Sequence, residues 1–385
     1  MISRQLKSFL WAALLALAPA LTGCGGGGED GDGGNDGTVD PSVDPPVDDG
    51  RDAVPDEMPD ADVPDDQAAD EDGPGPDGAW RPFSDVSPWN TRIPPDPELE
   101  PESAALVEDF MTSSPWGVHL DVNIPGYSIP LYWADSSTPT YTVLADYGGD
   151  GWVGDNGANA TGTMPIPGGA TPDTESDHHF LVVDRALGTE WGCWNMVNEG
   201  GSWHAGLCAT ADLFGTGVRV PATEADPWYR AHGARACGFP LVAGLIRVEE
   251  IEAGRIDHAL VVAYPHIRSG WFTSPASTGQ ARVDDEAIST RGVPCGGRFQ
   301  FDPGIDLDTL GLSRSGRIIM LALQEYGAYV GDYSGALSLY AENSPEAQAT
   351  WAGGVLDSYE LLDKIDLSQF RVIRLGTLYD YGNGD

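Results

Sequence analysis

The sequence predicts a mainly β domain, a β-sandwich or jelly-roll-like arrangement of antiparallel sheets with a few peripheral helices. From Trp80 onward, short β-like runs such as "GYSIPLYWA" and "TYTVLADY" recur between turn residues. Gly and Pro are frequent, with 50 and 30 residues in the chain, as expected for many short strands joined by turns. Helical patterns do not alternate regularly with the strands, which disfavours a parallel βα fold.

The N-terminus has the layout of an export signal. Arg4 and Lys7 precede an apolar run over residues 9–21 that is too short to span a bilayer. The run ends in "LTGC", which matches the bacterial lipobox, so the chain resembles a bacterial lipoprotein. This resemblance implies a signal peptide over residues 1–23 and lipidation of Cys24, and we expect an anchor in the outer membrane or at the cell surface. An ordinary signal peptide with an incidental cysteine is the alternative.

Residues 24–78 join the lipidated cysteine to a disordered acidic tether. From residue 25 on, the tether contains 19 Asp or Glu against the single Arg51, and it has no aromatic residue. Such a composition cannot bury enough apolar surface to offset its chain entropy. The formal net charge of −40 disfavours nucleic acid as a partner, because nucleic-acid binding needs basic patches. The oligomeric state is not indicated.

The remaining residues, 79–385, predict a single β-rich exported domain. Four helices are expected, over residues 102–111, 246–253, 315–326 and 357–364, the second and third ending at Gly254 and Gly327. A last strand is expected at "FRVIRLG". The Gly/Asp-rich stretch 146–157 is expected to be a surface loop. We expect no cofactor; calcium in this loop is the alternative, although the spacing of an EF-hand loop is missing.

Four cysteines of the domain predict two disulfides, because an exported chain folds in an oxidising compartment. Cys193 and Cys208 flank a Gly-rich segment typical of a hairpin, so we expect them to pair. Cys237 and Cys295 then form the second bond. A zinc site is not expected, since the sequence has no CxxC pair.

Two histidines begin similar apolar runs. His179 opens "HFLVV" and His258 opens "HALVV", with Asp177 and Asp257 just upstream. Alternation along a strand places His178 and His179 on opposite faces, so these neighbours are not expected to act together. If the two runs are adjacent strands, His179 and His258 share one cleft. Catalytic acid or base roles, hydrogen bonding at a strand end and a metal site with the aspartates are the three interpretations.

Arginine, tyrosine and acid side chains supply further candidates. Arg255 lies just before the second histidine run, and an Arg beside a His can bind a carboxylate, as a uronate-cleaving lyase requires. Tyr326 and Asp332 lie in "QEYGAYVGDYSG", where aromatics beside acids suit sugar rings. The alternatives are structural: tyrosines that fill the core, and a surface ion pair between Arg247 and Glu250.

Several segments together resemble an uncharacterised family of exported bacterial proteins: "PFSDVSPWNTRIP", "HHFLVVDR", "FPLVAGLIRVEEIEAGRIDHAL" and "LALQEYGAYVGDYSG". The resemblance covers most of residues 82–340 and implies a domain family without implying an activity. The stretch "YGAYVGDYSG" is also faintly similar to a Tyr-rich strand of jelly-roll alginate lyases.

These observations favour a surface-anchored lipoprotein that acts on an extracellular or cell-wall polysaccharide, by lyase or glycoside hydrolase chemistry. His179 and His258 are the acid/base candidates, Arg255 the carboxylate anchor, and Tyr326 or Asp332 a partner. A non-catalytic surface-binding or structural lipoprotein is the alternative, and calcium-stabilised adhesion ranks third.

Overall fold

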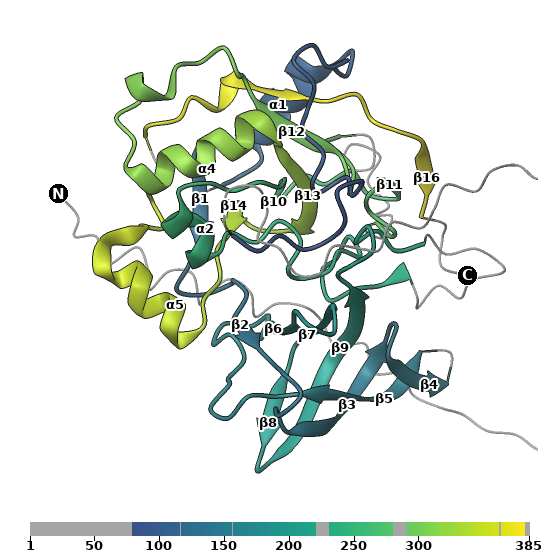
Figure 1. Cartoon of the computed structure of the whole chain (residues 1–385). Coiled ribbons are helices and arrows are strands. Elements are labelled where there is room, and N and C mark those ends of the chain that lie inside the picture. Colours follow the sequence, from purple (N-terminus) through teal and green to yellow (C-terminus); the bar gives the residue numbers. More distant parts are fainter. Residues whose placement is uncertain are drawn as a thin grey trace, which may run out of the picture. The chain divides into compact units, whose positions relative to one another are not determined.

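The computed structural model describes residues 79–381, apart from residues 116, 156, 221–230, 280–290 and 362. Strands dominate the described residues and helices are few, which confirms the mainly β prediction (Figure 1). The predicted signal peptide, Cys24 and tether lie outside the described residues. No helix in the described ranges is both long and apolar enough to cross a membrane.

A six-stranded sheet carries the larger core. Its strands follow the order β1 (Leu120–Asn123), β14 (Leu337–Tyr340), β10 (Leu260–Tyr264), β13 (Ala328–Tyr333), β12 (Arg298–Phe301) and β15 (Phe370–Val372). Helix α1 (Ser103–Thr112) packs against β15, and helix α4 (Arg314–Glu325) packs against β12. The sheet therefore buries one face under these two helices (Figure 1).

An eight-stranded sheet carries the second core. Its order is β2 (Leu131–Trp133), β6 (Phe180–Asp184), β7 (Thr189–Trp194), β9 (Ser202–Asp212), β3 (Thr140–Gly148), β5 (Ala158–Pro165) and β4 (Trp152–Asp155), and β8 (Val197–Glu199) also pairs with β9. A separate two-stranded ribbon joins β11 (Trp271–Thr273) to β16 (Leu378–Asp380).

Both large sheets are mixed. Most neighbouring strands are antiparallel, but β1–β14, β10–β13, β2–β6 and β3–β9 are parallel. Parallel neighbours cannot be joined by a tight turn, so they come from segments far apart in the sequence. The parallel pairs are a detail that alternation along single strands does not predict.

The two apolar runs that begin with histidine form fully buried strands. In β6, Leu181 and Val183 belong to the larger core, whereas Phe180 and Val182 belong to the second core. Strand β10 is also buried along its whole length. Both runs are thus covered on both faces, as their lack of polar alternation predicts. They nevertheless lie in different sheets.

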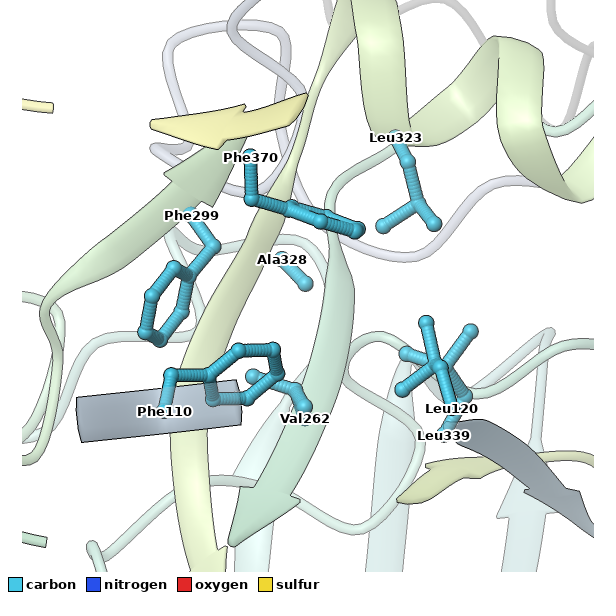
Figure 2. Close-up of a pocket in the computed structure, with 8 residues that line it drawn as sticks. All are labelled: Phe110, Leu120, Val262, Phe299, Leu323, Ala328, Leu339 and Phe370. Atoms are coloured by element: carbon cyan, nitrogen blue, oxygen red, sulfur yellow. The ribbon is translucent and has the colours of Figure 1, made fainter. Parts of the chain in front are cut away.

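The larger core is tightly filled. Eight apolar side chains surround a void of about 10 Å³: Phe110, Leu120, Val262, Phe299, Leu323, Ala328, Leu339 and Phe370 (Figure 2). They come from both helices that cover the sheet and from all six of its strands. A void of this size holds at most one water molecule, so it is a packing defect and not a ligand site.

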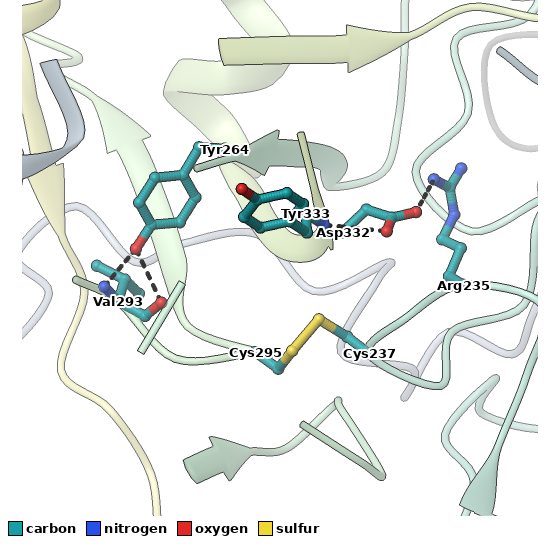
Figure 3. The surroundings of a disulfide bond; sticks show 7 residues. All are labelled: Arg235, Cys237, Tyr264, Val293, Cys295, Asp332 and Tyr333. Carbon is teal, nitrogen blue, oxygen red and sulfur yellow. Dashed lines mark hydrogen bonds and ion pairs between the residues drawn. A yellow bond between two sulfur atoms is a disulfide. The ribbon is translucent and has the colours of Figure 1, made fainter. Parts of the chain in front are cut away.

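Both predicted disulfides are confirmed. Cys193 and Cys208 join β7 to β9 at directly paired positions. Cys237 and Cys295 join two loops that are 58 residues apart in sequence (Figure 3). Each bond constrains the unfolded chain, and the second also fixes two loops that have little regular structure of their own.

Three of the predicted helices form. The first is α1, the second is α2 (Val248–Ala253), and the third is α4. Gly254 adopts φ 91° and Gly327 adopts φ 67°, the left-handed conformation that makes glycine the favoured residue just after a helix.

The predicted helix over 357–364 is wrong. Its described residues form turns, because the Asp357 side chain accepts the Tyr359 backbone N–H and Asp363 adopts φ 60°. A helix not predicted from the sequence, α5 (Pro345–Thr350), precedes it. Ser344 caps α5 by accepting the Ala347 N–H, and Pro345 occupies the first turn, so the signal was present in "SPEAQ".

The stretch 146–157 is mostly strand and not a surface loop. Strand β3 continues to Gly148, and β4 begins at Trp152 after a short turn. Pairing of β3 with both β5 and β9 satisfies its backbone, which outweighs the loop-forming tendency of Gly and Asp. Within the described residues, no group of three or more His, Cys, Asp or Glu could hold a metal ion.

Candidate functional site

A pocket of about 390 Å³ opens where five segments meet. The segment just before β6 contributes Asp177 and His179, strands β7 and β9 contribute Trp194 and Leu207, and the end of β13 contributes Asp332 and Tyr333. The loop at residues 232–236 closes the remaining side. Two of the sequence candidates, His179 and Asp332, therefore lie in one pocket although 153 positions separate them in the sequence.

Backbone hydrogen bonds just before the start of β6 place Asp177 beside the end of β7. The Asn195 N–H donates to the Asp177 carbonyl at 2.8 Å, and the Met196 N–H donates to the His178 carbonyl at 3.0 Å. His178 adopts φ 41°, which turns the chain just before β6. The ring of His178 instead hydrogen-bonds with the Asp173 carbonyl, outside the pocket lining, so the adjacent histidines have different surroundings, as predicted.

Asp332 is turned toward the pocket by an irregularity in β13. The register with β10 shifts after Val262, so that Val330 and Asp332 oppose successive residues and Gly331 is extra. A side chain at Gly331 would collide with Val261 and Phe239, which explains the glycine. The shift aims the Asp332 carboxylate at the pocket and not along the sheet.

The Asp332 carboxyl group has a strongly perturbed pKa. Burial raises the pKa to about 7, the Arg235 charge opposes this, and the Asp177 charge adds to it. Hydrogen bonds from the backbone N–H groups of Tyr333 and Ala236 favour the carboxylate but do not restore the usual value. Burial also raises the pKa of Asp177. The pocket thus holds two interacting acids, one of which binds a proton near neutral pH.

Arg235 is the buried cation of the site. Its side chain is 0 % exposed, its Nη1 lies 4.0 Å from Asp332 Oδ2, and its guanidinium lies 4.3 Å from the centre of the Tyr340 ring. The disulfide at Cys237 holds the loop in place two residues further on, and Figure 3 shows Arg235 extending from this loop toward Asp332. Arg235 is not among the residues that the sequence predicts for the site, and its only signal in the sequence is the neighbouring Cys237.

His179 is a neutral acceptor and not a base poised near neutral pH. Burial, followed by the Arg235 charge, lowers the pKa of His179 to about 3. Its ring hydrogen-bonds to the Ala234 backbone, whereas Nδ1 is buried and has no hydrogen-bond partner among the described residues. A buried nitrogen without a partner is costly unless a ligand supplies one. In this pocket the partner would be a hydroxyl or another donor.

Two aromatic side chains border the pocket. Trp194 is 41 % exposed and Tyr333 is 60 % exposed. The Trp194 side chain hydrogen-bonds to Asp177, which lowers the pKa of that acid against the effect of burial. Flat apolar faces therefore adjoin carboxylates, the arrangement expected for a site that stacks sugar rings.

His258 lies in a separate buried network. Its Nε2 is 2.8 Å from Glu250 Oε1, and its Nδ1 is 2.9 Å from the Ala259 carbonyl. Arg247 donates to the same Glu250 at 2.8 Å, so the pair expected on a helix surface is buried. The described residues that line the pocket do not include His258, and the structure does not bring the two histidines together.

Arg255 and Tyr326 belong to a third cluster. Arg255 forms ion pairs with Asp257 and Glu325, and the Tyr326 hydroxyl accepts from Arg92 Nε at 3.0 Å. These partners neutralise Arg255 outside the described lining of the pocket. The three sequence candidates outside the pocket are therefore engaged in ion pairs or hydrogen bonds that stabilise the fold.

Comparison of the chain with protein-family models, curated protein sequences and solved structures found no match.

Proposed function

We propose that this protein hydrolyses a glycan, with Asp332 as general acid and Asp177 as the second carboxylate. One observation carries the proposal: a carboxyl group that binds a proton near neutral pH lies in a pocket with a second acid and with exposed aromatic faces. Glycoside hydrolysis requires two carboxyl groups whose environments separate their pKa values.

The chemistry assigns each acid one step. Protonated Asp332 donates its proton to the glycosidic oxygen as the bond from that oxygen to the anomeric carbon breaks. A water molecule adds to the anomeric carbon and gives a proton to the Asp177 carboxylate. A shift of the side chains that cover the buried Nδ1 of His179 would let it accept a hydrogen bond from a sugar hydroxyl, which would fix the ring.

Lyase chemistry on a uronate is less well supported. A lyase must neutralise the substrate carboxylate with an exposed cation. In the pocket the Arg235 side chain is 0 % exposed, and Arg255 is paired with acids elsewhere. The Asp177 carboxylate would also repel a polyanion. These features favour a neutral or amino-sugar glycan.

The anchor completes the proposal. A lipid on Cys24 and the acidic stretch that follows would hold the domain at the outer membrane or cell surface, within reach of an extracellular or cell-wall polysaccharide. Incorporation of a radiolabelled fatty acid into the full chain, and its loss in Cys24→Ser, tests this part separately.

The enzymatic part is tested with neutral and N-acetylated polysaccharides, including chitin, cellulose and peptidoglycan. We expect new reducing ends with the full chain, a loss of at least about 100-fold in Asp332→Asn, and no change in Asp135→Asn, the same substitution on an exposed turn. Release of unsaturated uronate from alginate would overturn hydrolysis in favour of a lyase. Binding without cleavage would favour the non-catalytic alternative.

A further inference from the structure

The pocket continues as a row of side chains across three strands. Trp194 of β7 pairs with Leu207 of β9, and Leu207 pairs with Tyr147 of β3. Residues directly paired across strands project to the same face of a sheet. Trp194 and Leu207 line the pocket, so Tyr147 lies on the pocket side of the sheet. We call Trp194, Leu207 and Tyr147 the aromatic row.

A crease in the sheet explains why this row faces outward. Pairing passes over Asp146 of β3, Asn159 of β5 and Gly206 of β9, and the pairing of β7 stops at Trp194, just before Asn195. Asn159 and Asn195 adopt φ 47° and 53°. Beyond the crease the alternation of faces is reset. A Cβ at Gly148 would lie 2.6 Å from the Ala160 Cβ in the second core, so Gly148 faces that core and Tyr147 faces away from it.

The row presents flat apolar surface at a regular spacing. Trp194 is 41 % exposed and Tyr147 is 50 % exposed. Neighbouring strands are about 4.8 Å apart, so the two rings arise from positions roughly 10 Å apart. Leu207 lies between them and packs partly against the larger core, which leaves a shallow apolar floor. The Trp194 ring lies across Gly206, where a Cβ would be only 2.6 Å from it.

We propose that the aromatic row is a second glycan subsite, and that the protein binds a neutral or amino-sugar polymer whose chain runs from the pocket across β7, β9 and β3. This inference rests on the proposed function and extends it from a sugar to a polymer. The supporting observation is that the aromatic row is continuous with the pocket. The row begins with Trp194, which hydrogen-bonds to Asp177, and ends with the exposed Tyr147 on the same face of the sheet.

The charges near the row favour this occupant. Asp155 of β4 and Asp177 of the pocket are acids near the two ends of the row, and the cation of the pocket, Arg235, is buried. An acidic polysaccharide would be repelled, whereas a neutral chain needs only ring stacking and hydroxyl hydrogen bonds. A second copy of the domain could occupy the same surface, and the test below distinguishes such self-association from glycan binding.

The test measures binding of chito-oligosaccharides and cello-oligosaccharides, from dimer to hexamer, by titration calorimetry. The full chain carries Asp332→Asn in all samples to prevent cleavage. Tyr147→Ala is compared with Tyr141→Ala, a matched control: Tyr141 is 39 % exposed on the same strand but pairs with Met164 of the second core. Thermal unfolding confirms that both variants fold.

We expect the hexamer to bind more tightly than the dimer, and Tyr147→Ala to weaken hexamer binding about three- to tenfold while leaving the dimer and the control unaffected. Unchanged hexamer binding in Tyr147→Ala, or equal affinity for dimer and hexamer, would overturn the subsite alone if Asp332→Asn still abolishes cleavage. Absence of both binding and cleavage would overturn the proposed function as well. Self-association that Tyr147→Ala abolishes would assign the row to a second copy.

Discussion

Arg235 Nη1 lies 4.0 Å from Asp332 Oδ2, and yet the acid keeps a pKa of about 7. A cation at this distance would ordinarily favour the carboxylate. Burial and the nearby Asp177 outweigh it, because the guanidinium is itself buried and its charge is shared with Tyr340 and Glu190. Arg235 therefore limits the pKa of the acid and does not abolish its perturbation.

Replacing Arg235 tests this balance. Arg235→Met removes the charge while keeping an apolar chain, so the pKa of Asp332 should rise above its present value of about 7. The pH profile of cleavage, or the carboxyl carbon shift of Asp332 measured by NMR, should show its titration moving to higher pH. Arg235→Lys keeps a charge and should move it less. A titration that moves to lower pH would contradict the assigned roles.

Stability should depend on pH through Asp332. Its pKa is raised from 3.8 to about 7 on folding. A raised pKa means that the folded state binds the proton more tightly, so the contribution is complete below pH 3.8 and is lost as pH rises toward 7. Asp332→Asn should remove this slope, measured as the difference in urea unfolding free energy between variant and wild type from pH 4 to 8. Parallel curves would show that the acid is ionised in the folded protein.

Glu342 should also make the free energy of unfolding decrease as pH rises toward 7. Burial raises its pKa to about 7, and its carboxylate accepts the Val248 N–H at 2.6 Å. Because Glu342 does not belong to the described lining of the pocket, Glu342→Gln should flatten the same pH window of stability while leaving glycan binding unchanged. A loss of binding would place this acid in the site after all.

His179 should act as an acceptor with no titration of its own near neutral pH. Its pKa of about 3 keeps the ring neutral throughout the range from pH 5 to 8. His179→Ala should weaken oligosaccharide binding about three- to tenfold, the value of one hydrogen bond, without changing the shape of the pH profile. His119→Ala is the control, since the His119 ring pairs with Asp121, and neither residue belongs to the described lining of the pocket. If the pH profile of cleavage by His179→Ala lacks its acidic or basic arm, His179 acts as a catalytic acid or base.

The disulfide between Cys237 and Cys295 should stabilise the fold and the site together. It closes a 58-residue separation, for which chain entropy predicts about 4 kcal/mol. The Cys237→Ser/Cys295→Ser double variant should lose that much in urea unfolding, and its loop should hold Arg235 less firmly. The Cys193→Ser/Cys208→Ser pair, separated by 15 residues, is the comparison and should lose about 3 kcal/mol. Equal binding in the first variant and wild type would show that the loop is fixed by other contacts.

Local patterns predicted much of the fold. Strand periodicity, glycines after helices and cysteine spacing led to the mainly β class, to three helices and to both disulfides. The shared "HxLVV" pattern was misleading about the site, since β6 and β10 both need a buried run but lie in different sheets. The buried position of His258 is explained by Glu250. A carboxylate inside the core requires a hydrogen-bonding partner, and the His258 ring supplies one.

The candidate site could be predicted only in part. His179 was a candidate because it opens one of two similar apolar runs, and Asp332 because it lies among tyrosines in "QEYGAYVGDYSG". Arg235 did not, because nothing in its own loop shows which acid it faces; that depends on a disulfide partner 58 residues away and on the register shift in β13. Long-range pairing of this kind leaves no periodicity in the sequence.

The crease through Asn159 and Asn195 has a consequence for how ligand preference can change. On one side of it, side chains such as Val143 and Trp203 fill the second core. On the other side, Trp194 and Tyr147 face outward, although they belong to the same strands or their neighbours. The residues that would select a ligand are therefore separate from those that hold the sheet together, and substitutions at the outward positions can alter selectivity at little expense in stability.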